Sequence, residues 1–187
     1  MRIVGGIFRG RRLASFRGLS IRPTGDMVRE AVFNVLSPGF HDRFRRVLDL
    51  FAGTGAMGIE ALSRGSAEAV FVDSDPKSAA IIGKNLAALG IEGAEVLKAD
   101  AIKAIADFAR SGERFDLIFI DPPYESALTL EALTAIGGRG ILNPGGVVVA
   151  ETSRRNPATP APPGLKPLAE KRYGDTVVRF YTTPDVC

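Results

Sequence analysis

The 187-residue sequence contains no tryptophan, a single histidine (His41) and a single cysteine (Cys187). One cysteine cannot form an internal disulfide, and together with one histidine it cannot build a thiolate zinc cluster. No segment approaches the roughly 18 uncharged apolar residues of a membrane helix, and the first six residues lack the apolar core of a signal peptide. These absences predict a cytoplasmic protein with no metal centre and no membrane association.

The remaining composition is that of a folded, soluble domain. Hydrophobic residues make up 45% of the chain and charged residues 24%, which excludes disorder and collagen-like repetition. A chain of this length can bury a sizeable core as one domain. The sequence has no long coiled-coil pattern, so we expect a monomer.

Positive charge is concentrated at the start of the chain. Residues 1–25 contain no acidic residue and six arginines: Arg2, Arg9, Arg11, Arg12, Arg17 and Arg22. Glycines interrupt this arm as they would interrupt a hairpin, so we expect it to be structured. A guanidinium group binds two phosphate oxygens at once, so such an arm is typical of nucleic-acid binding. A solvated basic tail is the alternative.

After the arm, the pattern predicts a helix that Thr24 caps and that ends at Leu36. From residue 46 onwards, short apolar segments alternate with helical ones. Strands are predicted at 47–51, 69–73, 95–98, 115–121 and 146–151, and helices at 56–64, 76–89, 101–110 and 127–136. This alternation predicts an α/β fold with a doubly wound, mostly parallel sheet in the order 3-2-1-4-5, covered by helices on both faces.

The end of the chain departs from this alternation. Residues 168–173 and 176–182 flank Gly174-Asp175 and predict a hairpin. Added to the five parallel strands, the hairpin closes a seven-stranded sheet with an antiparallel pair. We therefore divide the chain into a small N-terminal extension, 1–40, made of the basic arm and a helix, and a main α/β domain, 41–187.

A glycine-rich loop follows the first predicted strand. Gly53, Gly55 and Gly58 have the spacing of the dinucleotide-binding fingerprint. Asp73 ends the next strand, where an acidic residue binds ribose hydroxyls. The pattern alone fits the adenosine of NAD and that of S-adenosylmethionine equally well. A tight turn that binds nothing is the structural alternative.

Two further acidic residues lie close to the predicted site. Asp49 interrupts an apolar strand, where a carboxylate is costly unless it meets hydrogen-bond donors or a cation such as a sulfonium cofactor. Asp100 follows the third strand, at the sheet edge where doubly wound folds bind ligands. Asp100 can bind an adenine amine beside the amide of Ala101, or can simply cap the next helix, and the two roles are compatible.

The tetrapeptide Asp121-Pro122-Pro123-Tyr124 directly follows the fourth predicted strand. It is suited to an exocyclic amine on an aromatic ring, because the Asp121 carboxylate and the Pro122 carbonyl can accept its N–H groups. Pro123 would fix that carbonyl, and Tyr124 would stack on the ring. As structure alone, the prolines would merely end a strand. Opposite the glycine loop, the tetrapeptide predicts in-line methyl transfer without a covalent enzyme intermediate.

The glycine loop and the Asp-Pro-Pro-Tyr motif together resemble those of amino-methyltransferases that use S-adenosylmethionine. Residues 22–36 (RPTGDMVREAVFNVL) and 5–11 (GGIFRGR) narrow the resemblance to the bacterial RsmD family, which methylates the N2 amine of a guanine in 16S ribosomal RNA. The resemblance extends through nearly the whole chain and implies a Rossmann-like class I methyltransferase fold. The family commonly has Glu where this chain has Asp73, and often a second Thr where it has Gly25.

The resemblance also implies a role for each motif. Catalysis is implied for Asp121, Pro122, Pro123 and Tyr124. Cofactor binding is implied for Asp49, Phe51, Gly53, Thr54, Gly55, Gly58, Asp73, Ser74, Asp100 and Ala101. RNA binding is implied for Arg2, Arg9, Arg11, Arg12, Arg22, Thr24 and Arg29. The implied substrate is 16S RNA, free or within a 30S subunit or an assembly intermediate.

Other functions fit parts of the sequence. A DNA adenine-N6 or cytosine-N4 methyltransferase would use the same motif, but little of the chain is left over for reading a DNA sequence. An NAD-dependent dehydrogenase needs a proton donor near its cofactor, and His41 lies outside the predicted sheet. Carbon-5 methylation of pyrimidines needs a thiolate, and Cys187 is terminal. A non-enzymatic RNA-binding protein would not need intact reactive motifs.

The basic arm and the glycine loop are separate in the sequence. We therefore expect that deleting residues 1–18 weakens RNA binding and leaves the binding of S-adenosylmethionine intact.

Overall fold

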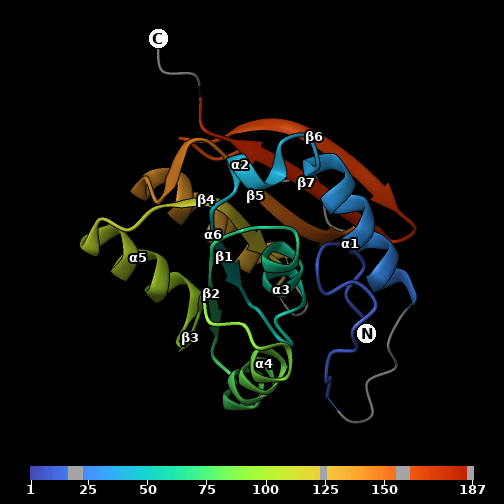
Figure 1. The fold of residues 1–187 in the computed structure, drawn as a ribbon. Coiled ribbons are helices and arrows are strands. Elements are labelled where there is room, and N and C mark those ends of the chain that lie inside the picture. The colour runs from blue at the N-terminus through green and yellow to red at the C-terminus, as the bar shows by residue number, and fades with distance from the viewer. Residues whose placement is uncertain (17–22, 123–125, 155–160, 185–187) are drawn as a thin grey trace.

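The computed structural model describes residues 1–16, 23–122, 126–154 and 161–184. Its strands are β1 (Arg46–Leu50), β2 (Glu68–Asp73), β3 (Ala94–Lys98), β4 (Phe115–Ile120), β5 (Leu142–Ser153), β6 (Lys166–Tyr173) and β7 (Thr176–Thr182). They form one sheet in the order β3-β2-β1-β4-β5-β7-β6 (Figure 1). The first five strands are parallel, and β7 is antiparallel to both β5 and β6. The predicted α/β class, strand order and closing hairpin are confirmed.

Helices cover both faces of this sheet. They are α1 (Pro23–Leu36), α2 (Phe40–Arg43), α3 (Ala56–Ser63), α4 (Pro76–Leu89), α5 (Ala101–Ser111) and α6 (Ser126–Arg139). Side chains of α1, α3 and α4 share one buried cluster with the sheet, and those of α5 and α6 share the cluster on the opposite face. We call these the α1/α3 face and the α5/α6 face.

Several local features differ from the sequence-based prediction, and three of them are informative. Helix α1 begins at Pro23, so the prediction that Thr24 is its N-cap is wrong, and Thr24 lies in the first turn. A proline is well suited to the first helical position because its fixed φ is already helical. The short helix α2 was not predicted. Strand β5 begins four residues early, at Leu142, and pairs with Phe115 across a register irregularity.

The N-terminal arm folds as a hairpin. Arg2 bridges Arg12 in antiparallel fashion, and the Ile3 amide donates to the carbonyl of Arg11 at 3.0 Å. Ile3 and Leu13 are buried in the same hydrophobic cluster as α1 and the sheet. The arm therefore contributes to the core of the domain.

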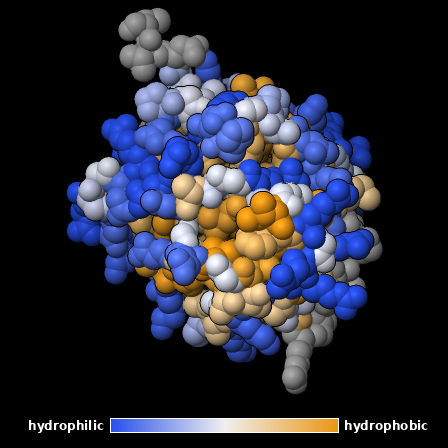
Figure 2. Space-filling model, in the orientation of Figure 1, coloured by the Kyte–Doolittle hydropathy of each residue, from blue (hydrophilic) through white to orange (hydrophobic). Residues whose placement is uncertain are grey.

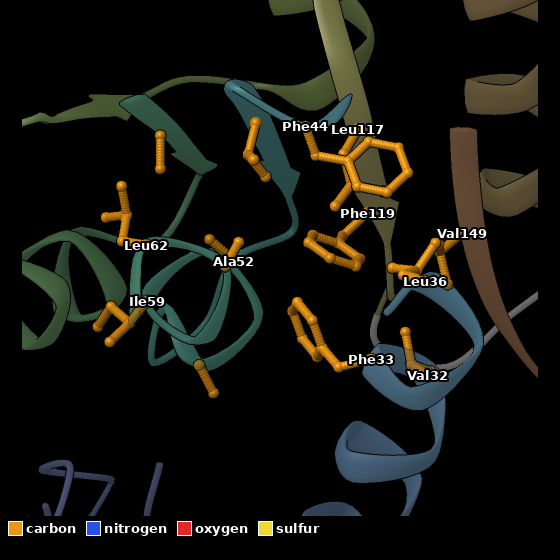
Figure 3. Close-up of a cluster of buried hydrophobic side chains, with 14 of the residues drawn as sticks. Val32, Phe33, Leu36, Phe44, Ala52, Ile59, Leu62, Leu117, Phe119 and Val149 are labelled. Carbon is orange, nitrogen blue, oxygen red and sulfur yellow. The ribbon is translucent and has the colours of Figure 1, made fainter. Parts of the chain in front are cut away.

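The centre of that cluster is aromatic. Figure 3 shows Phe33 of α1 directed toward Phe119 of β4, and their ring centroids are 5.7 Å apart. Phe33 also contacts Phe40 of α2 at 5.5 Å. These contacts, worth about 0.5–1.5 kcal/mol each beyond their buried area, hold α1 over the carboxyl half of the sheet.

The surface in the orientation of Figure 1 is mostly hydrophilic, with one apolar area near its middle (Figure 2). In the described part of the chain, no helix combines the length and the apolar character required to span a membrane.

Candidate active site

A pocket of about 600 Å³ opens at the carboxyl ends of the parallel strands. The loop after β1 and the end of β2 line one part of it, and the ends of β4 and β5 line another. Helix α1 contributes Gly25, Val28, Arg29 and Val32 to a third wall. Ligands of doubly wound folds bind at this edge, where the strand order reverses between β1 and β4.

The loop after β1 is tied to the end of β2. The Gly53 amide donates to Asp73 Oδ2 at 2.8 Å, and the Ala52 amide donates to the Val72 carbonyl at 3.0 Å. Phe51 has a φ of 61°, which is uncommon for a residue with a side chain. Phe51, Gly53 and Asp73 all line the pocket, together with Thr54 and Ser74.

The other two glycines of the fingerprint lie behind the pocket wall. A Cβ on Gly58 would overlap the ring of Phe71, so a glycine is required for α3 to approach the sheet. Gly55 has a φ of 77° and precedes the first residue of α3. We predicted both as cofactor-binding residues, but neither is among the residues that line the pocket.

Asp49 is buried at the floor of the pocket, with 3% of its surface exposed. The Gly58 amide donates to its Oδ2 at 2.9 Å. Burial nevertheless raises the pKa of Asp49 to about 8, and the nearby carboxylates of Asp121 and Asp73 add to that increase. A cation bound in the pocket would relieve this unfavourable arrangement.

Asp121 and Pro122 follow β4 and line the same pocket. The Asp121 side chain lines the pocket, and desolvation by the surrounding protein raises the pKa of its carboxyl group to about 6. Pro123 and Tyr124, the other two predicted catalytic residues, lie outside the described residues.

Glu151, near the end of β5, also lines this end of the pocket and was not predicted as a site residue. Burial and the neighbouring Asp121 raise the pKa of Glu151 to about 8, and a hydrogen bond from Thr176 partly opposes that increase. An acid that directly follows five buried residues of a parallel strand could have been noticed in the sequence. No group of three or more His, Cys, Asp or Glu side chains among the described residues is arranged to hold a metal ion.

Four apolar side chains face this acidic end of the pocket. Val32 of α1, Phe119 of β4, Val149 of β5 and Val178 of β7 all line it. Apolar walls with a few polar groups are typical of sites that bind planar rings. This part of the pocket is therefore suited to an aromatic base.

Asp100 and Ala101 are not among the residues that line the pocket. Asp100 caps α5, and its side chain accepts from the Lys103 amide at 2.9 Å. Ala101 is buried against the α5/α6 face. Of the two roles that the sequence leaves open for Asp100, the structure shows the cap, and neither residue lines the described pocket.

The tip of the arm is fixed to the end of α3. The Ile7 amide donates to the Ser63 carbonyl at 2.7 Å, and Ser63 Oγ donates to the Gly5 carbonyl at 2.6 Å. Gly6 has a φ of 74°, and a Cβ there would overlap the Ser63 carbonyl. This close approach requires a glycine.

The arm also forms part of the pocket. Met1 and Phe16 line it, and the hydroxyl of Thr54 lies 3.5 Å from Met1 Sδ. The Ala14 amide donates to Asn85 Oδ1 at 2.7 Å, which fixes the arm beside α4. This geometry argues against our expectation that deleting residues 1–18 would leave cofactor binding intact.

The arginines predicted to bind RNA fall into two groups. Arg2, Arg9, Arg11 and Arg12 are exposed on the arm. Arg29 is only 4% exposed, and its Nη2 donates to the Arg2 carbonyl at 2.6 Å and to Asp26 Oδ1 at 2.7 Å. Arg29 therefore joins α1 to the arm, a position that differs from the exposed phosphate contact we expected. Arg22 lies outside the described residues, and the position of the Thr24 side chain is not described.

A buried carboxylate completes this junction. Glu60 of α3 is fully buried, and its Oε2 accepts from the Val4 amide at 2.8 Å. Its Oε1 accepts from Arg64 Nε at 2.8 Å, and Arg29 Nε lies 3.6 Å from Oε2. Two cations and a backbone amide thus compensate the charge of Glu60, which is the condition under which such burial is tolerated.

Comparison with known proteins identifies the group to which the chain belongs. A family described as "Conserved hypothetical protein 95", which is the RsmD family, matches residues 1–182. The chain belongs to the RsmD family. Ribosomal RNA small subunit methyltransferase D of Haemophilus influenzae is 34% identical to this RsmD-family chain over 186 residues, covering 97% of this chain and 93% of the relative.

Solved structures agree with this assignment. The yhhF protein of Escherichia coli superposes with a TM-score of 0.85 at 31% identity, covering 98% of this chain and 97% of that one. The 16S rRNA N2 G1207 methyltransferase RsmC of Thermus thermophilus, solved with AdoMet and guanosine, gives a TM-score of 0.69 at 25% identity, with 90% of this chain and 45% of that one covered. The Rossmann-like methyltransferase fold that the sequence predicts is confirmed.

Proposed function

We propose that this RsmD-family chain transfers a methyl group from S-adenosylmethionine to the exocyclic N2 amine of a guanine in 16S ribosomal RNA. One observation carries the proposal: Asp121 and Pro122 line the same pocket as the glycine loop and Asp73. The broader assignment, an rRNA methyltransferase that uses S-adenosylmethionine, is supported by the name of the Haemophilus relative and by the fold. The choice of guanine N2 as the methylated atom is the more specific part of the proposal.

The residues around the glycine loop fit this cofactor. Asp73 already accepts from the amides of Gly53 and Asp75, and the remaining lone pairs of its carboxylate can accept ribose hydroxyls. Among the described residues no cation pairs with buried Asp49, and the cofactor carries positive charge on its sulfur and its amino group. S-adenosylmethionine supplies a methyl group that the sulfonium has already activated. The protein is left with binding and orientation, which are worth at most roughly 7–11 kcal/mol.

The other end of the pocket fits the amine of a nucleobase. An amine on an aromatic ring is a weak nucleophile because its lone pair is delocalised into the ring. When Asp121 and the Pro122 carbonyl accept its N–H groups, the lone pair is turned out of the ring plane and toward the cofactor. Guanosine bound to RsmC supports guanine as the base. In RNA the base must leave its stack to enter the pocket.

The exposed arginines of the arm fit the RNA backbone. Met1 and Phe16, at the open end of the hairpin, line the pocket, whereas its tip is bound to Ser63 at the far end of α3. Phosphates bound by Arg9, Arg11 and Arg12 would therefore hold RNA that extends away from the entering base. Such contacts position RNA without reading its sequence, and they weaken as salt is added. The RNA would be recognised either free or within a 30S particle, and activity on each substrate distinguishes the two.

The decisive experiment combines a variant with mapping of the methyl group. Asp121→Ala should reduce methyl transfer by about 100- to 10,000-fold, because the amine loses its acceptor, while the affinity for S-adenosylmethionine stays within about threefold of the wild-type value. Asp107→Ala, an exposed carboxylate on α5, is the matched control and should keep full activity. Mass mapping should place the methyl on guanine N2. A methyl on adenine N6 or cytosine N4 would contradict the proposal.

A further inference from the structure

Three carboxylates lie on one face of three adjacent strands. Asp49 of β1 pairs in register with Phe119 of β4, which pairs with Val149 of β5. Because side chains alternate along a strand, Asp121 and Glu151, two residues further on, share the face of Phe119 and Val149. Both lie at the carboxyl ends of their strands and line the pocket.

These carboxylates occupy different ends of the pocket. Asp49 is at the cofactor end, where it accepts from the Gly58 amide. Glu151 is at the opposite end, between Asp121, which follows β4, and Thr176 on β7. Methyl transfer as proposed above gives roles to Asp49 and Asp121 and none to Glu151. Thr176 donates one hydrogen bond to Glu151, and the other lone pairs of this half-buried carboxyl group remain available. A ligand with an N–H at this position would use them.

The geometry of the pocket indicates which atoms of the base would reach Glu151. β1 and β5 flank β4, and the cofactor end of the pocket lies over β1. With the amine held at Asp121, the rest of the ring must therefore extend toward β5 and β7. One of the two ring atoms that flank the amine-bearing carbon would then lie beside Glu151.

That ring atom differs among the bases that carry an amine. In guanine, the carbon that bears the N2 amine is flanked by N1, an N–H donor, and by N3, which lies on the side of the sugar, so N1 is the atom that can enter the pocket. Adenine has an unprotonated N1 next to its N6 amine, and cytosine has an unprotonated N3 next to its N4 amine. A carboxylate oxygen accepts a hydrogen bond from guanine and meets a lone pair in the other two.

We propose that Glu151 is a specificity-determining residue, which accepts the N1–H of the target guanine while Asp121 and Pro122 hold the N2 amine. When Glu151 is ionised, the same contact rejects adenine and cytosine, because it would place two acceptors against each other. This inference rests on the proposed function and deepens it, since it explains how a site for amines in general would select guanine.

The test compares guanine with 2-aminopurine, which keeps the 2-amino group and lacks the N1–H. The substrate is 16S RNA in which the methylated guanine is replaced by 2-aminopurine, assayed at pH 8.5, where Glu151 is mostly ionised and guanine keeps most of its N1–H. The wild-type enzyme should prefer guanine by about 10- to 100-fold in kcat/KM. In Glu151→Gln the side-chain amide can donate to the N1 lone pair, so this preference should fall about tenfold or more. Glu131→Gln, exposed on α6, is the matched control and should keep the wild-type preference.

The preference is a ratio within each enzyme, so effects of the analogue on RNA folding or on the reactivity of the amine cancel between enzymes. A merely structural role for Glu151 would slow both substrates equally and leave the ratio unchanged, which would overturn the inference. Equal use of guanine and 2-aminopurine by the wild type would also overturn it, whether or not the variant folds. If the wild type methylates no guanine at all, the proposed function is refuted, and this inference with it.

Discussion

The two faces of the sheet are stabilised in different ways. On the α5/α6 face, buried aliphatic and aromatic side chains such as Leu48, Ile105 and Ile118 pack against each other. On the α1/α3 face, the buried residues also include Arg29, Asp49, Glu60, Ser63 and Asn85. Every one of these polar residues either lines the pocket or bonds to the arm or to α3.

The difference shows where the molecule places its directional interactions. Apolar burial depends on area and tolerates small shifts, whereas a buried carboxylate such as Glu60 is satisfied only when its donors take one arrangement. The α5/α6 face can therefore act as a stable support. The α1/α3 face fixes the arm, α1 and the glycine loop relative to one another, and these segments form the pocket.

The largest expected effect comes from paired truncations on β4. Ile118 faces α5 and α6, and Phe119 faces α1 and the pocket; both are almost fully buried. Ile118→Ala should lower the free energy of unfolding by about 2–5 kcal/mol, and Phe119→Ala by about 3–5 kcal/mol. Only Phe119→Ala should also raise KM for the RNA substrate, measured on the fraction of the variant that remains folded. Denaturant unfolding and steady-state kinetics measure the two effects, and a raised KM in Ile118→Ala would break the comparison.

A smaller effect is expected from paired glycine substitutions in the arm. Gly6 and Gly10 both have positive φ, but only Gly6 would bring a Cβ against the Ser63 carbonyl. Gly10→Ala should cost about 1 kcal/mol from its backbone conformation alone. Gly6→Ala should cost about 2–4 kcal/mol, because the hairpin must leave α3. Gly6→Ala should also weaken cofactor binding, because Met1 and Phe16, which line the pocket, would move with the arm.

Melting curves and calorimetric titration with S-adenosylmethionine would separate these two variants. Equal melting temperatures, or an unchanged cofactor affinity in Gly6→Ala, would show that the pocket does not depend on the docked arm.

Replacing Asp49 should stabilise the protein. The pKa of Asp49 is about 8 in the folded state against an ordinary value of 3.8, so between those pH values the native state holds a proton that the unfolded state releases. Stability from this group therefore falls as pH rises across that window, by up to about 1.4 kcal/mol per pH unit, and levels off above pH 8. Asp49→Asn keeps an acceptor for Gly58 and removes this slope.

Unfolding free energies at pH 5, 7 and 9 provide the measurement. The gain of Asp49→Asn over the wild type should increase from pH 5 to pH 8 and then stay constant, while cofactor affinity falls. Parallel pH profiles for the two proteins would mean that Asp49 titrates normally in the fold.

The smallest expected effect is a release of protons on cofactor binding. At pH 7.5 Asp49 and Glu151 are mostly protonated, and a cation in the pocket lowers both pKa values. S-adenosylmethionine should release up to about one proton, and S-adenosylhomocysteine, which lacks the sulfonium charge, should release less. Calorimetry in phosphate and in Tris, whose ionisation enthalpies differ, gives the number of protons released from the difference between the two binding enthalpies. Identical enthalpies in the two buffers would contradict this linkage.

The fold could be predicted because its signals are local. Continuous apolar segments such as the one ending at Asp121 mark strands buried on both faces, and the helices between them imply the parallel order. The family could be recognised because each of its motifs is a short continuous segment, whether a loop such as 49–58 or a helix such as 23–36. The hairpin at Gly174-Asp175 followed from turn chemistry.

What could not be predicted depends on distant contacts. Nothing near Met1 or Phe16 in the sequence indicates that the arm would line the pocket, because their neighbours there, such as Thr54, are far along the chain. In the sequence, Arg29 is simply a basic residue of a predicted helix. Its burial is explained by its ion pairs with Asp26 and Glu60, which only the structure shows. In the sequence, Glu151 is only the last residue of a predicted strand. Its position beside Asp121 follows from the register between β4 and β5, which the sequence does not give.

The contacts of the arm also set an order of assembly during synthesis. The Val4 amide bonds to a side chain 56 residues later, and the Ala14 amide to one 71 residues later. The hairpin is therefore made first but cannot dock until α3 and α4 have left the ribosome. During that interval Ile3 and Leu13, two apolar side chains of the finished core, have no native surface to cover them. Slowing translation between residues 15 and 60 should prolong that exposure and increase capture of the nascent chain by chaperones.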